Sequence, residues 1–344
     1  MSDVPHLRFP EFTERWDTYR IADILCIGNG RDYKHLSKGD IPVFGTGGYM
    51  TSVNECLYEG ETTFIGRKGT INKPFYYNGK FWTVDTLFYT HSFKRVIPKF
   101  VYCLFQTINW LRYNEASGVP SLSKDTIEKI KVRIPQLDEQ KKIAKLLSLL
   151  DERIATQNKI IEKYESLIKG IAQNVACNNK PNIRLSECLK CSSSTLQESD
   201  VCENGTYPVY GANGIVGYLN NYNTEKEAVY IIKDGSGVGT VSYVTGKCSA
   251  TGTLNTLQAK EGYSLQYLYY MLKVFNFETY KTGMAIPHIY FKDYGKAKIF
   301  CPSYTKQLKY VGLLSAIDNK LSAEQSILTD LRLQKQYLLR QMFI

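Results

Sequence analysis

The sequence predicts an α+β protein made by internal tandem duplication, with two mostly-β domains joined by two long antiparallel α-helices. The helices are expected to form a coiled-coil spacer with pseudo-two-fold symmetry. Three observations predict this fold: the chain repeats itself, each copy begins with short strand-like segments, and each copy ends in a heptad pattern. A repeat period near 167 residues is too long for a solenoid and indicates a duplicated unit.

The repeat covers nearly the whole chain. Pro135 in RIPQLDEQKK matches Pro302 in FCPSYTKQLK, 167 positions later, and Asp151 matches Asp318 at the same spacing. Upstream, IPVFGTGGYM (41–50) matches YPVYGANGIV (207–216) at a spacing of 166, which indicates a one-residue insertion or deletion between the blocks. We therefore expect four parts: a β domain at 1–135, a spacer helix at 136–178, a second β domain at 179–302 and a second spacer helix at 303–344.

Within the first copy, IPVFGTGG, ETTFIGRKGT and KPFYYNGKFWTVDTLFYT are rich in Val, Ile, Tyr, Phe and Thr and are broken by Gly and Asn. This composition predicts strands and turns, with a hairpin turn at residues 77–80 (Tyr-Asn-Gly-Lys). One helix is expected to interrupt the strands around residues 98–112. A second helix, from Leu265, corresponds to it in the other copy.

After Pro135 the apolar period changes to three and a half residues, which predicts two long amphipathic helices. Asp138 is the predicted N-cap of the first helix, and the segment 177–181 (Cys-Asn-Asn-Lys-Pro) is expected to end it. The expected packing positions are Ile143, Leu147, Leu150, Ile154, Ile161, Tyr164, Ile168, Leu314, Ile317, Leu321, Leu328, Leu331 and Leu338. The simplest prediction is that the two helices pack on each other; packing on their own domains, or on another chain, remains the alternative.

Composition narrows the class of function. The chain has 26 tyrosines and a formal net charge of +10, which indicates either a polyanionic partner or only solubility. Nine cysteines in a chain without a signal-peptide pattern favour reduced thiols, and no apolar run reaches the length of a membrane span. We therefore expect a cytoplasmic protein with no membrane partner.

Three motifs invite a chemical interpretation. The segment 72–75 (Asn-Lys-Pro-Phe) resembles the catalytic loop of amino-methyltransferases, but Lys73 replaces a proline and no Gly-rich cofactor loop precedes it. The loop 234–239 (Asp-Gly-Ser-Gly-Val-Gly) meets neither the dinucleotide nor the P-loop pattern. Cys188 and Cys191 form a CxxC, yet no second pair follows, and the repeat places Cys188 at a core-type position.

The remaining residues offer no catalytic pattern. The four histidines show no paired spacing, and no Ser or Cys lies in a nucleophile-elbow sequence. We therefore predict no catalytic residue, no metal site and no cofactor bound by this chain itself.

Several blocks carry a family resemblance: HLRFPEFTERW, IPVFGTGG, FIGRKGTINKPFYYNGKFWTVDTLFY, SGVPSLSKDTIEKIKVRIPQLDEQKKIAKLLSLLDERI and IPHIYFKDYGKAKIFCPSYTKQ. Together they resemble the specificity subunit of type I restriction-modification systems over essentially the entire chain. The most specific feature is a Gly-Val-Pro-Ser segment that continues through a Pro-x-x-x-x-Gln turn into a long helix. Its copy occurs at the corresponding place in the second half.

The resemblance implies that each β domain is a target-recognition domain reading one half of a bipartite, asymmetric double-stranded DNA site. It also implies partner subunits: two methyltransferase (modification) subunits that bring S-adenosylmethionine, and restriction/translocase subunits that bring ATP and Mg. Gln157, Glu324 and Lys335 depart from the apolar seam, and they either fix the helix register or mark where modification subunits dock.

Reading bases needs side chains that reach the groove edges, on loops bent by glycine. The candidate DNA contacts of the first domain are Thr46, Gly47, Gly48, Tyr49, Arg67, Lys68, Lys73, Ser117, Ser121 and Lys124. Those of the second are Ala212, Asn213, Gly214, Lys233, Asp234, Ser236, Met284, His288 and Lys292. The competing interpretation is a non-catalytic coiled-coil scaffold with two protein-binding domains.

Overall fold

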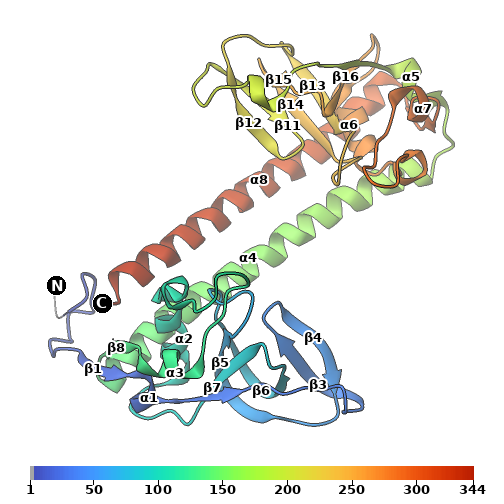
Figure 1. Cartoon of the computed structure of the whole chain (residues 1–344). Coiled ribbons are helices and arrows are strands. Elements are labelled where there is room, and N and C mark those ends of the chain that lie inside the picture. The colour runs from blue at the N-terminus through green and yellow to red at the C-terminus, as the bar shows by residue number, and fades with distance from the viewer. Residues whose placement is uncertain (1–3) are drawn as a thin grey trace. The chain divides into compact units, whose positions relative to one another are not determined.

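The computed structural model describes residues 4–344 (Figure 1). The chain divides into two compact units: unit 1 is Met1–Asn158 with Ser326–Ile344, and unit 2 is Lys159–Gln325. The division cuts both long helices, α4 (Leu137–Cys177) and α8 (Tyr304–Gln341). Each unit therefore contains one β domain and a part of each long helix.

Unit 1 is built on a six-stranded mixed sheet in the order β2-β7-β5-β6-β3-β4, in which β3 and β6 run parallel. A separate antiparallel pair joins β1 and β8. The strands are β1 (Asp17–Arg20), β2 (Cys26–Asn29), β3 (Lys38–Gly45), β4 (Gly48–Val53), β5 (Tyr58–Gly66), β6 (Phe75–Thr83), β7 (Leu87–His91) and β8 (Lys131–Ile134).

Short helices complete the β domain of unit 1: α1 (Ile21–Ile24), α2 (Pro98–Thr107) and α3 (Lys124–Lys129). Proline starts α2, where its missing N–H costs nothing. The helix expected at 98–112 is shorter than predicted, because the backbone is extended at Ile108 and residues 110–113 form a separate 3₁₀ turn.

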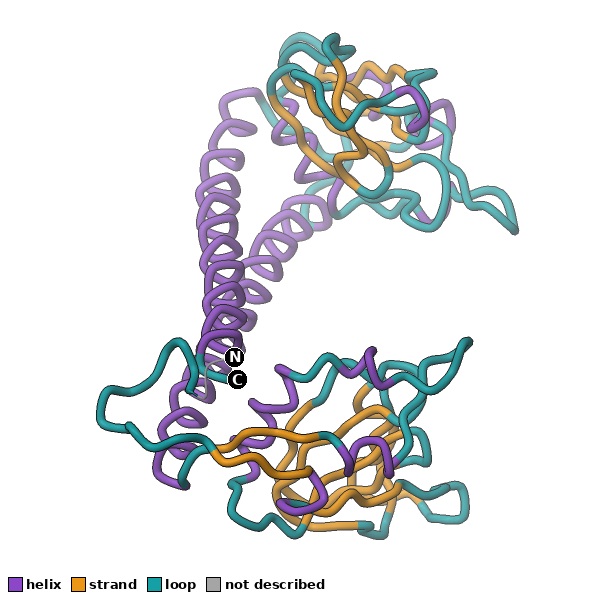
Figure 2. Tube along the Cα trace, turned by 60° about the vertical axis from the view of Figure 1, so that its left-hand side comes forward, coloured by secondary structure: helices purple, strands orange, loops and turns teal. Residues whose placement is uncertain are grey.

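Unit 2 repeats the strand order of unit 1. Its sheets run β10-β16-β13-β14 and β12-β11-β15, with the pair β9 and β17 in the place of β1 and β8. The strands are β9 (Ile183–Arg184), β10 (Leu189–Ser193), β11 (Tyr207–Gly211), β12 (Gly214–Leu219), β13 (Glu227–Ile232), β14 (Val241–Thr245), β15 (Ser249–Ala250), β16 (Leu254–Ala259) and β17 (Lys298–Ile299). The helices are α5 (Leu185–Cys188), α6 (Leu265–Lys273) and α7 (Phe291–Tyr294), and Figure 2 distinguishes strands, helices and loops by colour.

The β domain of unit 1 has one large sheet where unit 2 has two smaller ones, and the difference lies in one strand. In unit 1, β6 is continuous and pairs with β5 along most of its length and with β3 at its end. In unit 2 the corresponding stretch is divided into β14, which pairs with β13, and β15, which pairs with β11. Gly246, with a φ of +81°, lies in the interruption.

The hairpin turn expected at residues 77–80 is wrong. Asn78 and Gly79 lie in the middle of β6, and Gly79 is paired directly with Gly60 of β5. Both glycines have φ near +140°, a conformation that side chains other than glycine rarely adopt. Because glycine has no side chain, the two residues allow an irregular strand pair here. The chain turns instead in the loop between β5 and β6.

The largest core of unit 1 joins the β domain to the helices. Phe100 of α2 and Trp16 pack with Ile143 and Leu147 of α4, and Phe343, just after α8, stacks on Phe100 with ring centroids 5.4 Å apart. The start of α4 is therefore buried against its own domain as well as against the end of α8.

The long helices follow the predicted stripe. Every expected packing position is buried or half-buried, including Leu314, which is fully buried. In unit 1, Lys335 pairs with Asp151, and Arg332 donates to Asn158. Since the residue number falls along α8 as it rises along α4, the parts of the helices within unit 1 run antiparallel.

The ends of α4 are close to those expected. The helix begins at Leu137, so Asp138 is not the N-cap; it lies in the first turn, where its carboxylate pairs with Lys141 at 2.9 Å. A negative charge is favourable there because the first amide N–H groups are unpaired. Cys177, the first residue of the segment expected to end the helix, is the last residue of α4. Over residues 4–344, no helix is both long and apolar enough to cross a bilayer.

Candidate nucleic-acid interface

Two segments far apart in sequence are joined by backbone hydrogen bonds in unit 1. Gly69 N–H donates to the Pro120 carbonyl at 2.8 Å, and Leu122 N–H donates to the Arg67 carbonyl at 2.9 Å. Lys68 and Ser121 form an isolated β-bridge between these bonds. The loop after β5 is thereby fixed to the hairpin-like loop at 115–121.

These two segments line a depression of about 390 Å³, which also includes α3. Four predicted contact residues meet there: Arg67, Lys68, Ser121 and Lys124. The Arg67 guanidinium lies 5.9 Å from the centre of the Phe88 ring and donates to the Asp85 carbonyl at 3.3 Å. These contacts orient a planar cation at the surface, the group that most often reads guanine.

The turn between β3 and β4 lies beside the depression. A Cβ added to Gly69 would be 3.7 Å from the Thr46 hydroxyl, so the two loops are neighbours. Gly48 has a φ of +102°, which the tight turn requires. Tyr49 is 63% exposed. Of the other predicted contacts, Gly47, Lys73 and Ser117 are exposed, and none of these three lines the depression.

Unit 2 has the same backbone framework. Gly235 N–H donates to the Pro287 carbonyl at 3.0 Å, and Ile289 N–H donates to the Lys233 carbonyl at 3.0 Å. Asp234 and His288 form the bridge that corresponds to Lys68 and Ser121. The framework of the two loops is therefore conserved between the repeats.

The side chains on this framework differ between the units. The His288 ring lies 3.8 Å from the Asp234 carboxylate, in the place of a lysine and a serine in unit 1. Met284 is fully exposed at the tip of the hairpin-like loop 282–288, and Ser236 is exposed in the other loop. The ammonium of Lys292 lies 5.2 Å from the centre of the Tyr290 ring.

Unit 2 also has a tight turn between β11 and β12, formed by Ala212 and Asn213. Ala212 packs on the apolar cluster that includes Ile232, one residue before Lys233. Asn213 and Gly214 are exposed, and Gly214 has a φ of +98°. This turn corresponds to the turn at residues 46–47 of unit 1.

Sequence reasoning missed several residues at these loops. In unit 1, Asn29 and Glu115 line the depression, and hydrogen bonds from Thr126 and Ser123 lower the pKa of the Glu115 carboxyl. In unit 2, Ile286 is 61% exposed beside Met284. The repeat itself was the available signal, since Ile286 corresponds to the exposed Val119 of unit 1.

The CxxC motif gives no metal-binding cluster. Cys188 is fully buried, and its thiol lies within 3.6 Å of the Arg184 and Leu185 carbonyls. Burial raises the pKa of this thiol to about 12, which opposes the thiolate form that zinc requires. Among residues 4–344, no group of three or more His, Cys, Asp or Glu side chains is arranged to hold a metal ion.

Comparisons with known proteins agree with the repeat. A family model described as type I restriction modification DNA specificity domain matches the chain twice, at residues 13–166 and 182–332. The specificity subunit of the EcoprrI type I restriction enzyme of Escherichia coli is 27% identical over 34% of this chain. The MjaVIII specificity subunit of Methanocaldococcus jannaschii is 33% identical over 35%. The matched parts cover only 29% and 27% of those relatives.

Solved structures share the fold. The crystal structure of a type I restriction-modification system S subunit from M. genitalium matches with a TM-score of 0.72 and 18% identity, covering 99% of both chains. A chain from a study of the assembly and conformational transition of the type I R-M system matches with a TM-score of 0.53 and 15% identity, over 94% of this chain and 96% of that one. With two family matches that together span most of its length, this chain belongs to the type I restriction modification DNA specificity domain family.

Proposed function

We propose that this chain is the DNA sequence-specificity subunit of a type I restriction-modification complex. Each β domain reads one half of a bipartite, asymmetric target, and the long helices set the spacing between the halves and dock the methyltransferase subunits. The domain boundaries proposed are 1–135, 136–178, 179–302 and 303–344. The chain itself is non-catalytic and acts in the cytoplasm.

One observation carries this proposal: the two units present the same loop framework with different side chains. The bonds from Gly69 to Pro120 and from Gly235 to Pro287 hold equivalent backbones. The isolated β-bridge next to each bond joins Lys68 and Ser121 in unit 1, and Asp234 and His288 in unit 2. A reader of two different half-sites needs this combination, because bases are distinguished by side-chain donors and acceptors.

The candidate DNA contacts remain those of the sequence analysis, now with Asn29, Glu115 and Ile286 added. The modest charge of +10 suits a subunit that selects sequence while partners supply part of the phosphate contact. Those partners are two methyltransferase subunits, which bring S-adenosylmethionine, and restriction/translocase subunits, which bring ATP and Mg.

The test is binding to duplex DNA, with and without the methyltransferase partner, over a range of salt concentrations. We expect sequence-selective binding by the complex and a fall in affinity as salt rises, because phosphate contacts release counterions.

Arg67→Ala should lower affinity for the target by about 1–3 kcal/mol and relax selectivity at one position. Equal binding to target and scrambled duplexes by the complex would contradict the proposal and favour the protein-binding scaffold.

A further inference from the structure

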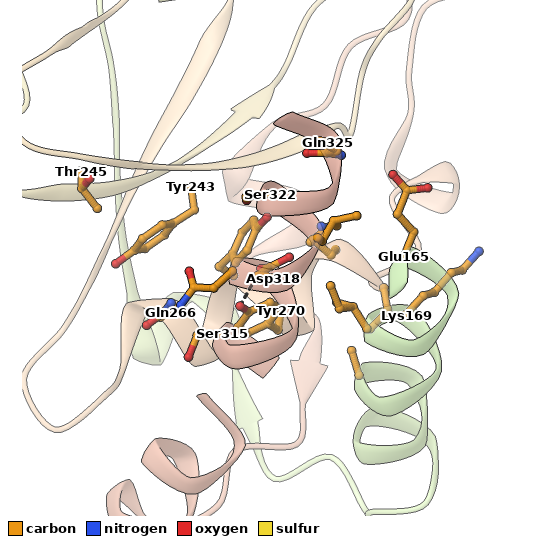
Figure 3. Close-up of a pocket in the computed structure, with 17 residues that line it drawn as sticks. Glu165, Lys169, Tyr243, Thr245, Gln266, Tyr270, Ser315, Asp318, Ser322 and Gln325 are labelled. Atoms are coloured by element: carbon orange, nitrogen blue, oxygen red, sulfur yellow. Dashed lines mark hydrogen bonds between the residues drawn. The ribbon is translucent and has the colours of Figure 1, made fainter. Parts of the chain in front are cut away.

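A cavity of about 740 Å³ lies within unit 2, at the junction of its β domain with the two long helices (Figure 3). Tyr243 of β14 and Tyr269 and Tyr270 of α6 line it from the domain, and Ile168 of α4 and Asp318 of α8 line it from the helices. Tyr270 donates its hydroxyl hydrogen to the Asp318 carboxylate at 2.6 Å. The cavity therefore combines aromatic rings with one half-buried carboxylate.

Unit 1 contains the equivalent junction, and an ammonium group fills it. Asp151, which corresponds to Asp318, accepts a hydrogen bond from the Lys335 ammonium at 2.5 Å. That ammonium also lies 5.5 Å from the centre of the Tyr102 ring, and Tyr102 corresponds to Tyr269. The Lys335 side chain is only 13% exposed, so its alkyl stem is covered.

The aromatic walls of the two junctions correspond as well. In unit 1 the rings of Tyr76 and Tyr102 are 6.0 Å apart, and in unit 2 those of Tyr243 and Tyr269 are 5.5 Å apart. The tyrosine on the strand bonds a glutamate of the neighbouring strand in both units. The two junctions thus share a carboxylate and two rings.

Several side chains at the junction differ between the units, among them Tyr270, which stands where unit 1 has Cys103. The repeat places Ile168 where unit 1 has Lys335, and an isoleucine supplies no charge to the carboxylate. Over the described residues, Asp318 has a hydrogen bond from Tyr270 and no ion-pair partner. Unit 2 therefore retains the carboxylate and the rings of the unit 1 site, without an ammonium paired with the carboxylate.

The other charged side chains around the cavity leave the position next to the Asp318 carboxylate open. The Lys273 ammonium lies 5.3 Å from the centre of the Tyr269 ring, and among the described residues it makes no ion pair with Asp318. Glu165 and Lys169 of α4 also line the cavity, and in Figure 3 the Lys169 ammonium points away from Asp318. A carboxylate in a partly desolvated aromatic pocket favours a cation with an apolar stem, by ion pairing and by cation–π attraction.

We propose that this cavity binds an alkylammonium group at Asp318, with the alkyl chain against Ile168 and the tyrosine rings. The bound group completes in unit 2 the contact that Lys335 makes within unit 1. Its source is either a small polyamine or a lysine side chain of a partner protein, since both present the same primary ammonium on an apolar stem.

The full-length chain is titrated with n-butylammonium chloride, and binding is followed by ligand-observed saturation-transfer NMR and by the melting temperature. Sodium butyrate, which has the opposite charge on an alkyl stem one carbon shorter, and NaCl at equal ionic strength are the controls. We expect saturation transfer and a rise in melting temperature with butylammonium only. A response to butyrate as large as that to butylammonium, or no response to either, would overturn the proposal.

Two variants locate the site. Asp318→Asn should weaken butylammonium binding by about tenfold, because the amide keeps the shape and removes the charge. Ile168→Lys should also abolish binding, since the new lysine would occupy the cavity and pair with Asp318 as Lys335 pairs with Asp151. Unchanged affinity in a folded Ile168→Lys protein would show that butylammonium binds elsewhere and would reject the site, even if Asp318→Asn failed to fold.

The two sources are then compared on the wild-type chain with 1,5-diaminopentane and with a lysine whose α-amino and α-carboxyl groups are blocked. Tighter binding of the diamine supports a polyamine, and tighter binding of the blocked lysine supports a partner side chain. If neither binds more tightly to the wild type than to Ile168→Lys, the alkylammonium assignment is wrong.

Discussion

Two buried glutamines fasten the long helices to the β domains that precede them. The Gln140 carbonyl oxygen accepts from Ile97 N–H at 3.1 Å, and its amide nitrogen donates to the carbonyls of Arg95 and Pro135 at 2.9 and 2.8 Å. Gln307 makes the corresponding contacts with Ser264 N–H and the Pro302 carbonyl in unit 2. The Pro-x-x-x-x-Gln pattern therefore has a physical role: one side chain satisfies backbone groups of the domain and of the helix entry.

Replacing Gln140 with Ala tests this role. The change leaves buried backbone groups without partners, and we expect the free energy of unfolding to fall by about 2–4 kcal/mol in urea titrations. Gln136→Ala is the matched control, because Gln136 is exposed one turn earlier. Similar stability of the two variants would mean that the Gln140 hydrogen bonds contribute little.

His91 makes the stability of unit 1 depend on pH. Its ring lies 5.8 Å from that of Tyr58 and 5.5 Å from that of Tyr89, and burial lowers its pKa, with a smaller effect from Lys124. The unfolded chain therefore binds this proton more readily than the folded one. Stability from the neutral ring is present above the unfolded pKa of about 6.5 and is lost as the pH falls toward the lower folded pKa.

We expect the free energy of unfolding to fall between pH 7.5 and pH 5.5, and to fall less in His91→Gln. Urea titrations of both proteins at the two pH values measure the difference. An equal fall in wild type and variant would show that His91 does not contribute.

At the scale of elements, the sequence predicted the long helices far better than the strands. The packing positions on each helix repeat with one period, so their signal accumulates along the chain. A turn is predicted from only two to four residues, so no repeated pattern along the chain reinforces the prediction. The Asn78-Gly79 pair lies within a strand because Gly60 faces Gly79 and the neighbouring strand continues past both.

The loop tips show the same limit for the candidate site. Comparison of the two repeats located both sets of candidate contact loops, because the chain kept their position. It could not show that Arg67, Lys68, Ser121 and Lys124 line one depression, since their meeting depends on backbone bonds between residues about fifty positions apart. Nor could it show that Lys73 lies outside that depression.

The exposed tip of the hairpin-like loop in unit 2 is expected to contact bases. Met284 and Ile286 project from a loop anchored by two backbone bonds between Thr282 and His288, at 2.9 and 2.8 Å. Apolar side chains of this kind contact thymine methyl groups or wedge between base steps.

The double variant Met284→Ser, Ile286→Ser should lower affinity for the specific duplex by about 1–3 kcal/mol while leaving nonspecific binding nearly unchanged. Fluorescence anisotropy of the chain in complex with the proposed methyltransferase partner measures both. Leu111→Ser is the control, as Leu111 is 54% exposed in unit 1 and lies outside the loops. Equal losses on specific and nonspecific DNA would exclude a base contact by this tip.

At the scale of the whole molecule, duplication is visible in sequence, topology and hydrogen bonding. The strand order of unit 1 recurs in unit 2, and equivalent glutamines and equivalent loop bonds stabilise each unit internally. The same comparison reveals what has diverged: the loop side chains, and the Lys335 position at the helix junction. Divergence on a conserved framework is the basis for assigning each unit its own half-site.

The most direct test of this account is methylation mapping of DNA from cells carrying the complete system. It is performed with the wild-type chain and with a chimera whose residues 1–135 come from another member of the family. The account predicts methylation at a bipartite, asymmetric sequence with unread bases between its halves, and a change in only one half in the chimera. A single continuous short site, or a change in both halves, would contradict it.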